Sequence, residues 1–74
     1  MLIETPLKPT EISSHLTFHR TVLVYFKDSE IPARVMNVVG NSVYVQHGKR
    51  FFWLRLGNAN VSRIVLYEFK SEVV

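Results

Sequence analysis

Residues 51–68 read FFWLRLGNANVSRIVLYE, and they contain the clearest strand and turn pattern of the chain. Two apolar runs, Phe51–Leu56 and Val61–Tyr67, flank a short polar segment that contains Gly57 and two asparagines. Apolar runs of this length, bounded by Gly and Asn, are typical of β-strands joined by a turn. The stretch therefore predicts two neighbouring strands with Arg55 close to the turn between them.

The same pattern extends toward the amino terminus of the chain. Apolar and other side chains alternate from Thr21 onward, and Asp28-Ser29, Gly40-Asn41 and His47-Gly48 supply the turns. Five short strands with turn residues at this spacing predict a small, strongly bent antiparallel barrel. The predicted strands cover residues 21–27, 31–39, 43–45, 51–56 and 61–67. Pro32 falls inside one of them, and we expect it at a bend, a bulge or an unpaired edge.

The first 20 residues are polar and contain Pro6 and Pro9. We expect residues 1–9 to form a flexible arm. After this arm, Thr10 is placed to cap a short helix that buries Ile12 and Leu16. A helix of two turns at most is unstable alone in water, so it must dock on the sheet or on a neighbouring subunit.

The chain of 74 residues forms one small domain, residues 1–74, whose core is marginal by itself. It has no cysteine, so neither disulfides nor thiolate metal sites reinforce that core. This combination favours self-association. There is no secretory signal pattern at the amino terminus and no apolar run long enough to span a membrane, so we expect a soluble, cytoplasmic protein without a membrane partner.

The charges are unevenly distributed along the chain. The formal net charge is +3, and no acidic residue lies between Glu30 and Glu68. A surface that carries only positive charges attracts polyanions through its long-range electric field and through the release of counterions. The alternative is that these cations only keep the protein soluble. The cations in this interval are Arg34, Lys49, Arg50, Arg55 and Arg63.

Two motifs of this chain carry a resemblance to a known protein family. The first is an alternating strand that ends in Lys27-Asp28-Ser29 and is followed by a second strand beginning at Ala33-Arg34-Val35. The second resembles the pattern Ile-Arg-Gly-Asn-Asn-Val with an apolar residue three positions on, and it is carried by Arg55, Gly57, Asn58, Asn60, Val61 and Ile64. Together these motifs resemble those of the Sm-like (LSm) superfamily. The resemblance covers residues 10–68, and the short predicted helix lies where that family has one.

The resemblance implies an SH3-like barrel of Sm-like type that assembles head to tail into a closed homomeric ring of roughly five to seven subunits. In such rings the fourth strand pairs with the fifth strand of the next subunit, which buries the aromatic face and satisfies the strand edge. The predicted oligomer interface consists of Phe51, Phe52, Trp53, Leu54, Val61, Ile64 and Leu66.

The resemblance also implies that the ring binds single-stranded RNA, rich in uridine or adenine, at its pore. The planar Arg55 guanidinium has five donors and suits phosphates or the face of a base, and asparagine amides suit base edges. The turn Lys49-Arg50 would add outer electrostatic attraction. The predicted RNA-binding residues are Arg55, Gly57, Asn58, Asn41, Lys49 and Arg50.

Two alternatives remain open. A monomeric SH3-like or Tudor-like module would bind a peptide if Trp53 and Tyr25 or Tyr44 were exposed together. A purely structural ring without RNA is favoured by the loop 38–42, which has neither an acid nor an aromatic ring. The spacing of His15 and His19 lacks the other ligands of a metal site, and no catalytic motif is present, so we predict neither a cofactor nor an enzyme.

Overall fold

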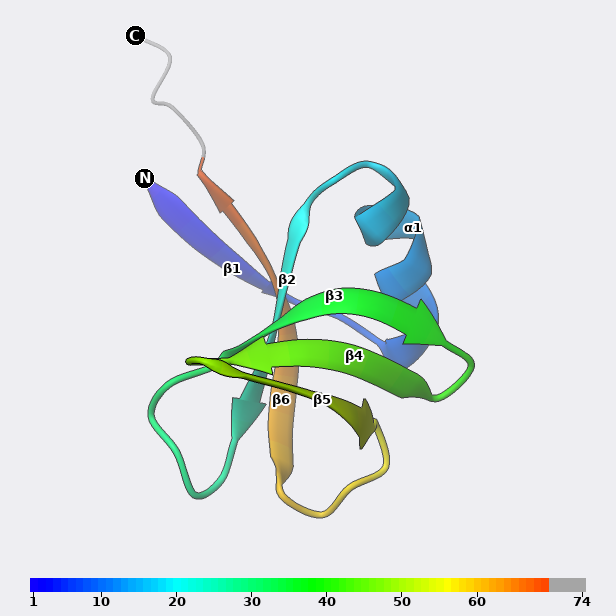
Figure 1. Cartoon of the computed structure of the whole chain (residues 1–74). Coiled ribbons are helices and arrows are strands. Elements are labelled where there is room, and N and C mark those ends of the chain that lie inside the picture. The colour runs from blue at the N-terminus through cyan, green and yellow to red at the C-terminus, as the bar shows by residue number, and fades with distance from the viewer. Residues whose placement is uncertain (70–74) are drawn as a thin grey trace, which may run out of the picture.

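The computed structural model describes residues 1–69 as a mainly β fold with one short α-helix, as predicted (Figure 1). It measures 42 × 25 × 22 Å along its principal axes. The elements are β1 (Leu2–Pro6), a 3₁₀ turn (Pro9–Glu11), α1 (Ile12–Thr17), β2 (Thr21–Phe26), β3 (Ala33–Val39), β4 (Ser42–His47), β5 (Arg50–Arg55) and β6 (Val61–Phe69).

All six strands belong to one antiparallel sheet in the order β1-β6-β2-β3-β4-β5. The sequence predicts five strands and a barrel, whereas the sheet formed by residues 1–69 has six strands and is not closed, because its edge strands β1 and β5 do not pair with each other. The sheet bends where β2 and β3 share only two residue pairs. As a result, β3, β4 and β5 cross over β2 and β6 (Figure 1).

The core lies inside this bend and follows the predicted alternation of side chains. On β2 every second residue is buried, and on β4 Val43 and Val45 are buried, while the other residues of both strands are half-buried. No polar or charged residue among residues 1–69 is buried, so the core is an apolar cluster stabilised by the hydrophobic effect. Its members are Ile12, Val22, Val24, Phe26, Ala33, Val35, Val43, Val45, Leu54, Ile64 and Leu66.

The helix α1 covers one end of the core, as expected for a helix too short to stand alone. Ile12 is fully buried and Leu16 packs against the same cluster. The predicted Thr10 cap is wrong: no cap hydrogen bond from its side chain is present, and the chain enters α1 through the 3₁₀ turn instead. At the start of that turn, the backbone N–H of Lys8 donates to the Glu11 carboxylate at 3.0 Å.

The first nine residues, expected to be a flexible arm, contain the strand β1. It runs antiparallel to β6 in a register that extends from Leu2 opposite Phe69 to Pro6 opposite Val65. The backbone N–H of Leu7 continues the ladder and donates to the carbonyl oxygen of Ile64 at 2.9 Å. In Figure 1, β1 and the end of β6 run side by side away from the bent body of the sheet.

The turns between the later strands follow from two glycines. Gly40 and Gly48 have φ angles of +57° and +64°, the region that suits the first position of a two-residue hairpin turn. Pro32 lies outside the strands, because β3 begins at Ala33. The proline therefore costs the sheet no ladder hydrogen bond.

A contact between side chains attaches β1 to the rest of the sheet. The Tyr25 hydroxyl donates a hydrogen bond to the Glu4 carboxylate, and the Arg63 guanidinium lies 3.9 Å from the centre of the Tyr25 ring. The hydrogen bond to Glu4 raises the pKa of Tyr25 above its ordinary value of 10.0, and desolvation and the Glu4 charge act in the same direction, whereas Arg63 lowers it. The neutral hydroxyl is therefore the form that this contact favours.

We expect the Tyr25 contact to make stability depend on pH in the alkaline range. Because the folded-state pKa is raised, the contribution is present below pH 10.0 and is lost as the pH rises through the raised pKa. Unfolding free energies of the wild type and Tyr25→Phe, measured against pH, should differ at neutral pH and converge only as the pH rises through the raised pKa of Tyr25. Tyr44→Phe serves as the control, since Tyr44 has no contact with Glu4; a constant difference for Tyr25→Phe would contradict the assignment.

Candidate functional site

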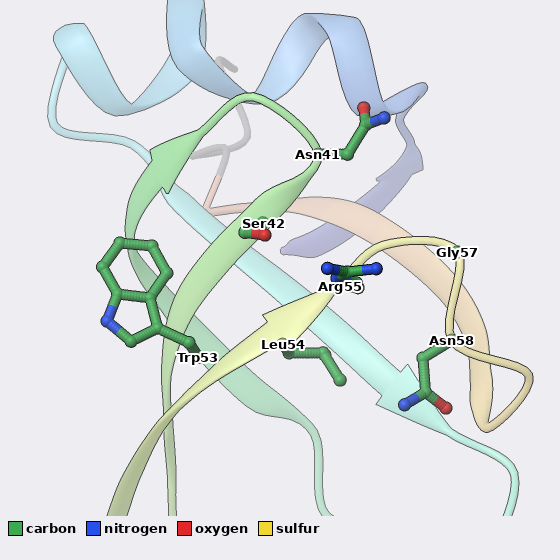
Figure 2. Close-up of a pocket in the computed structure, with 7 residues that line it drawn as sticks. All are labelled: Asn41, Ser42, Trp53, Leu54, Arg55, Gly57 and Asn58. Atoms are coloured by element: carbon green, nitrogen blue, oxygen red, sulfur yellow. The ribbon is translucent and has the colours of Figure 1, made fainter.

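An open hollow of about 780 Å³ lies where the turn between β3 and β4 meets the segment between β5 and β6 (Figure 2). Four of the six residues predicted to bind RNA line it. None of its lining residues is acidic, and most of them are polar. The residues that line it are Asn41, Ser42, Trp53, Leu54, Arg55, Gly57 and Asn58.

The register of β4 against β5 builds one wall of this hollow. Ser42 at the start of β4 lies opposite Arg55 at the end of β5. Beyond that pair, the N–H of Leu56 donates to the carbonyl oxygen of Asn41 at 2.8 Å, which ties the two turns together. The strand pairing therefore brings the Gly-Asn turn at residues 40–41 beside the second predicted motif.

The other wall is the segment of residues 57–60, which is held by its own asparagines. The N–H of Asn58 donates to the carbonyl oxygen of Arg55 at 3.0 Å. The side-chain oxygen of Asn58 accepts the N–H of Asn60 at 2.8 Å, an arrangement typical of asparagine in turns. The acceptor of the Asn58 amide is therefore used by the fold, while its NH₂ group bonds to no residue within 1–69.

A second contact fixes this segment to the first predicted motif. The Asn60 amide nitrogen donates to the Asp28 carboxylate at 2.9 Å, and the Lys27 N–H donates to the Asn60 carbonyl oxygen at 2.8 Å. Asp28 and Asn60 are 32 residues apart in sequence. The turn that ends β2 thus positions the segment that carries Asn58.

The Arg55 side chain is exposed and makes no hydrogen bond or ion pair within residues 1–69. Figure 2 shows its guanidinium between Ser42 and Gly57, whereas the side chains of Trp53 and Asn41 point away from it. All five guanidinium donors are therefore available to a ligand. Among the residues lining the hollow, Arg55 carries the only charge.

The structure does not bring Lys49 and Arg50 into this hollow. They lie at the opposite end of β5 from Arg55, and the six residue steps from Lys49 to Arg55 span roughly 20 Å of extended chain. Arg50 lines a second, smaller hollow of about 300 Å³, which shares Leu54 and Asn58 with the first. The second hollow is lined by Phe26, Asp28, His47, Arg50, Phe52, Leu54, Asn58 and Asn60.

The consecutive aromatic residues of β5 point to both faces, as their sequence predicts. Phe52 points inward, where His47 lies edge-on with the ring centres 6.5 Å apart. Phe51 and Trp53 are 52% and 54% exposed and flank Tyr44, whose ring centre lies 6.1 Å from Phe51 and 5.3 Å from Trp53. The outer face of β4 and β5 is thus an exposed aromatic face formed by Tyr44, Phe51 and Trp53.

The remaining residues of the predicted interface lie differently. The side chains of Leu54, Ile64 and Leu66 belong to the chain's own core, and Val61 packs against it. An interface that includes them would therefore use the backbone edges of β5 and β6 rather than these side chains. That interface stays a prediction.

Sequence reasoning missed several residues of the two hollows. The sequence analysis assigns Trp53 and Leu54 to an interface, and it assigns Asp28 and His47 only to turns. The alternation of side chains places Trp53 and Arg55 on the same face of β5, which is a signal readable from sequence. The pairing of Asp28 with Asn60 has no such signal, because it depends on two turns that meet only in the folded chain.

Neither a group of metal ligands nor a membrane-spanning helix is present within residues 1–69. No group of three or more His, Asp or Glu side chains in this part of the chain is placed to hold a metal ion, and His15 instead contacts Arg20, with 3.1 Å between Nδ1 and Nη1. No helix in the same range is long and apolar enough to cross a membrane.

Comparisons of this chain with protein-family models, with characterised proteins and with solved structures find no significant match.

Proposed function

We propose that the chain is an Sm-like protein that forms a homomeric ring and binds single-stranded RNA, rich in uridine or adenine, at the hollow beside Arg55. One observation carries this proposal. Arg55, Asn58 and Asn41 come from two separate turns, and the fold places them around one hollow of about 780 Å³ that contains no acid.

The groups around this hollow suit the chemistry of unpaired RNA. An exposed guanidinium binds a phosphate through several donors or stacks on a base. The NH₂ group of Asn58 and the hydroxyl of Ser42 offer hydrogen bonds to base edges or to the ribose hydroxyl, which single-stranded RNA leaves accessible. Since Arg55 has no acidic partner within residues 1–69, binding an anion breaks no ion pair.

Lys49 and Arg50 contribute through their charge and do not contact the nucleotide that Arg55 binds. At roughly 20 Å from Arg55 they lie within reach of neighbouring phosphates of a bound strand. Repetition of the hollow around a ring would turn weak single contacts into appreciable avidity. The proposed site is therefore electrostatic and repeated, with Arg55 as its central contact.

Arg55→Ala should weaken RNA binding selectively. We expect the affinity for short oligo-U or oligo-A to fall about tenfold or more, the effect of losing one charge-assisted contact. The dependence of log affinity on log salt should also become shallower by about 0.7 for each lost phosphate contact. The measurement is a titration at several salt concentrations, with native mass spectrometry to establish the oligomeric state.

Arg34→Ala is the matched control for this experiment. Arg34 is an exposed arginine of β3 outside the hollow, so its loss changes the net charge equally. We expect Arg34→Ala to reduce binding much less than Arg55→Ala. If wild type, Arg34→Ala and Arg55→Ala all bound RNA equally weakly, RNA binding at this hollow would be excluded and a structural ring without RNA would remain.

The exposed aromatic face supports a second candidate, a monomeric peptide-binding module of SH3-like or Tudor-like type. Tyr44 and Trp53 lie together, with 5.3 Å between ring centres, and Trp53 is half exposed. Aromatic surfaces of this kind bind proline-rich segments or cationic side chains. This candidate requires a monomer at micromolar concentration and a loss of binding in Trp53→Ala rather than in Arg55→Ala.

A further inference from the structure

The sheet order leaves β6 without a free edge along most of its length. β6 pairs with β2 on one side and with β1 on the other, so the edge strands of the sheet are β1 and β5. The proposed ring needs β5 of one subunit to pair with β6 of the next. In this structure β1 already lies at that position.

The backbone groups involved can be assigned from one hydrogen bond. The N–H of Leu7 donates to the carbonyl oxygen of Ile64, and bonded pairs alternate along an antiparallel ladder. The N–H and C=O groups of Ile64, Leu66 and Glu68 therefore face β1. A β5 strand from another subunit would need these same groups, so β1 and that strand exclude each other on β6.

The attachment of β1 is slight. Ile3 is half-buried, and the other four residues of the strand are exposed. Burial of so little apolar surface contributes little to holding the strand. One side-chain hydrogen bond between strands, from Tyr25 to Glu4, adds to the backbone ladder.

The two free edges of the sheet differ in their capacity to accept another strand. On β1, the alternation of the ladder directs the backbone hydrogen-bonding groups of Leu2, Glu4 and Pro6 away from β6, toward the free edge. Proline has no N–H to donate there. On β5, the hydrogen bond from the Leu56 N–H to the Asn41 carbonyl oxygen sets which residues bond to β4. By alternation, the backbone N–H groups of Phe51, Trp53 and Arg55 face the free edge, and all three are present as donors. β1 thus has the proline typical of a protected edge, whereas β5 does not.

We propose that β1 is an exchangeable cap on β6, and that β5 of a second copy of this chain displaces β1 during self-association. The proposal rests on the ring of the proposed function. A second copy is the partner that fits, because each chain has both the strand to give and the covered edge to receive it. Head-to-tail exchange of this kind pairs β5 of each subunit with β6 of the next, so a closed ring leaves no edge of β5 or β6 exposed.

A reversible lock tests the proposal. Leu2 and Phe69 are register partners, are 57% and 71% exposed, and form a non-hydrogen-bonded pair whose close Cα atoms suit a disulfide. The chain has no cysteine of its own, so Leu2→Cys combined with Phe69→Cys creates a single intended bond. We expect the oxidised protein to be a monomer by native mass spectrometry, and the reduced protein to assemble like the wild type. The control is Leu2→Ser with Phe69→Ser, under both conditions.

A second variant tests the cap from the opposite direction. The alternation places the Thr5 N–H against β6, so Thr5→Pro removes a hydrogen bond that holds the cap. We expect assembly at a concentration about five- to tenfold lower than for the wild type, the effect of one lost hydrogen bond. Leu2→Pro is the control, because the Leu2 N–H faces away from β6.

Two results would overturn the proposal. Equal assembly of oxidised and reduced protein would show that subunits join through another edge, such as β5 to β5 or the outer edge of β1. Monomers throughout for the wild type and Thr5→Pro would show that β1 covers the edge permanently. Failure of the RNA proposal is distinguishable, because assembly controlled by the lock but without RNA binding would contradict only the pore site.

Discussion

Val45→Asp should leave the chain unfolded at room temperature. Val45 is fully buried on β4, and its register partners are Val35 and Phe52. The substitution removes an apolar side chain worth about 1.5–3 kcal/mol and buries a carboxylate without a partner, which costs several kcal/mol more. A domain of 74 residues has a total stability of only about 4–11 kcal/mol. Far-ultraviolet circular dichroism should show the loss of β structure.

The control for this substitution is Gln46→Asp, the next residue on the same strand. Gln46 is half-buried on the outer face, where water reaches a carboxylate. We expect its thermal melt to stay cooperative and close to that of the wild type. If Val45→Asp melted as Gln46→Asp does, the assignment of faces on β4 would be wrong.

Ile12→Ala should destabilise the protein by about 3 kcal/mol, within the range of 2–5 kcal/mol for such core truncations. Ile12 is the only buried residue of α1 and is fully enclosed by the core cluster. For a domain of this size, the loss corresponds to a melting temperature lower by about 12–24 °C. Thermal unfolding followed by circular dichroism measures it.

Ser14→Ala on the same helix provides the comparison. Ser14 is exposed, so its substitution removes no core contact and slightly favours the helix. We expect the melting temperature of Ser14→Ala to stay within a few degrees of the wild type. A similar small effect for Ile12→Ala would mean that α1 does not depend on the core for its position.

The later strands could be predicted from the sequence because their signals are local. Alternating apolar residues define β2 and β4, and Gly40 and Gly48 occupy the turns where a positive φ is required. Strand boundaries differed from the prediction by few residues. The largest shifts are two residues, at the start of β3 after Pro32 and at the ends of β4 and β6.

β1 could not be predicted in the same way. Its five residues include Glu4, Thr5 and Pro6, and four of the five are exposed, so the segment has no apolar alternation. It becomes a strand because β6 extends to Phe69 and offers an unpaired edge, and a strand can use backbone groups alone. The proline is tolerated because its nitrogen faces away from β6.

The candidate site was predicted in part. Arg55, Gly57, Asn58 and Asn41 were selected from the turns, and these four line one hollow. The same reasoning assigns Lys49 and Arg50 to outer electrostatic attraction, and those cations lie at the far end of β5, outside the hollow. Sequence separation along a strand sets that distance, and the motif resemblance did not include it.

Local sequence patterns are enough to predict which residues alternate into the core, where the chain turns, and that Arg55 ends a strand beside a Gly-Asn turn, because each of these depends on near neighbours along the chain. Three contacts are visible only in the folded chain. Asp28 accepts a hydrogen bond from the Asn60 amide, the side-chain oxygen of Asn58 accepts a hydrogen bond within its own turn, and β1 pairs with the edge of β6. Those outcomes depend on backbone and polar groups from distant segments, whose pairing is set by the bend of the sheet and leaves no periodic pattern in the sequence.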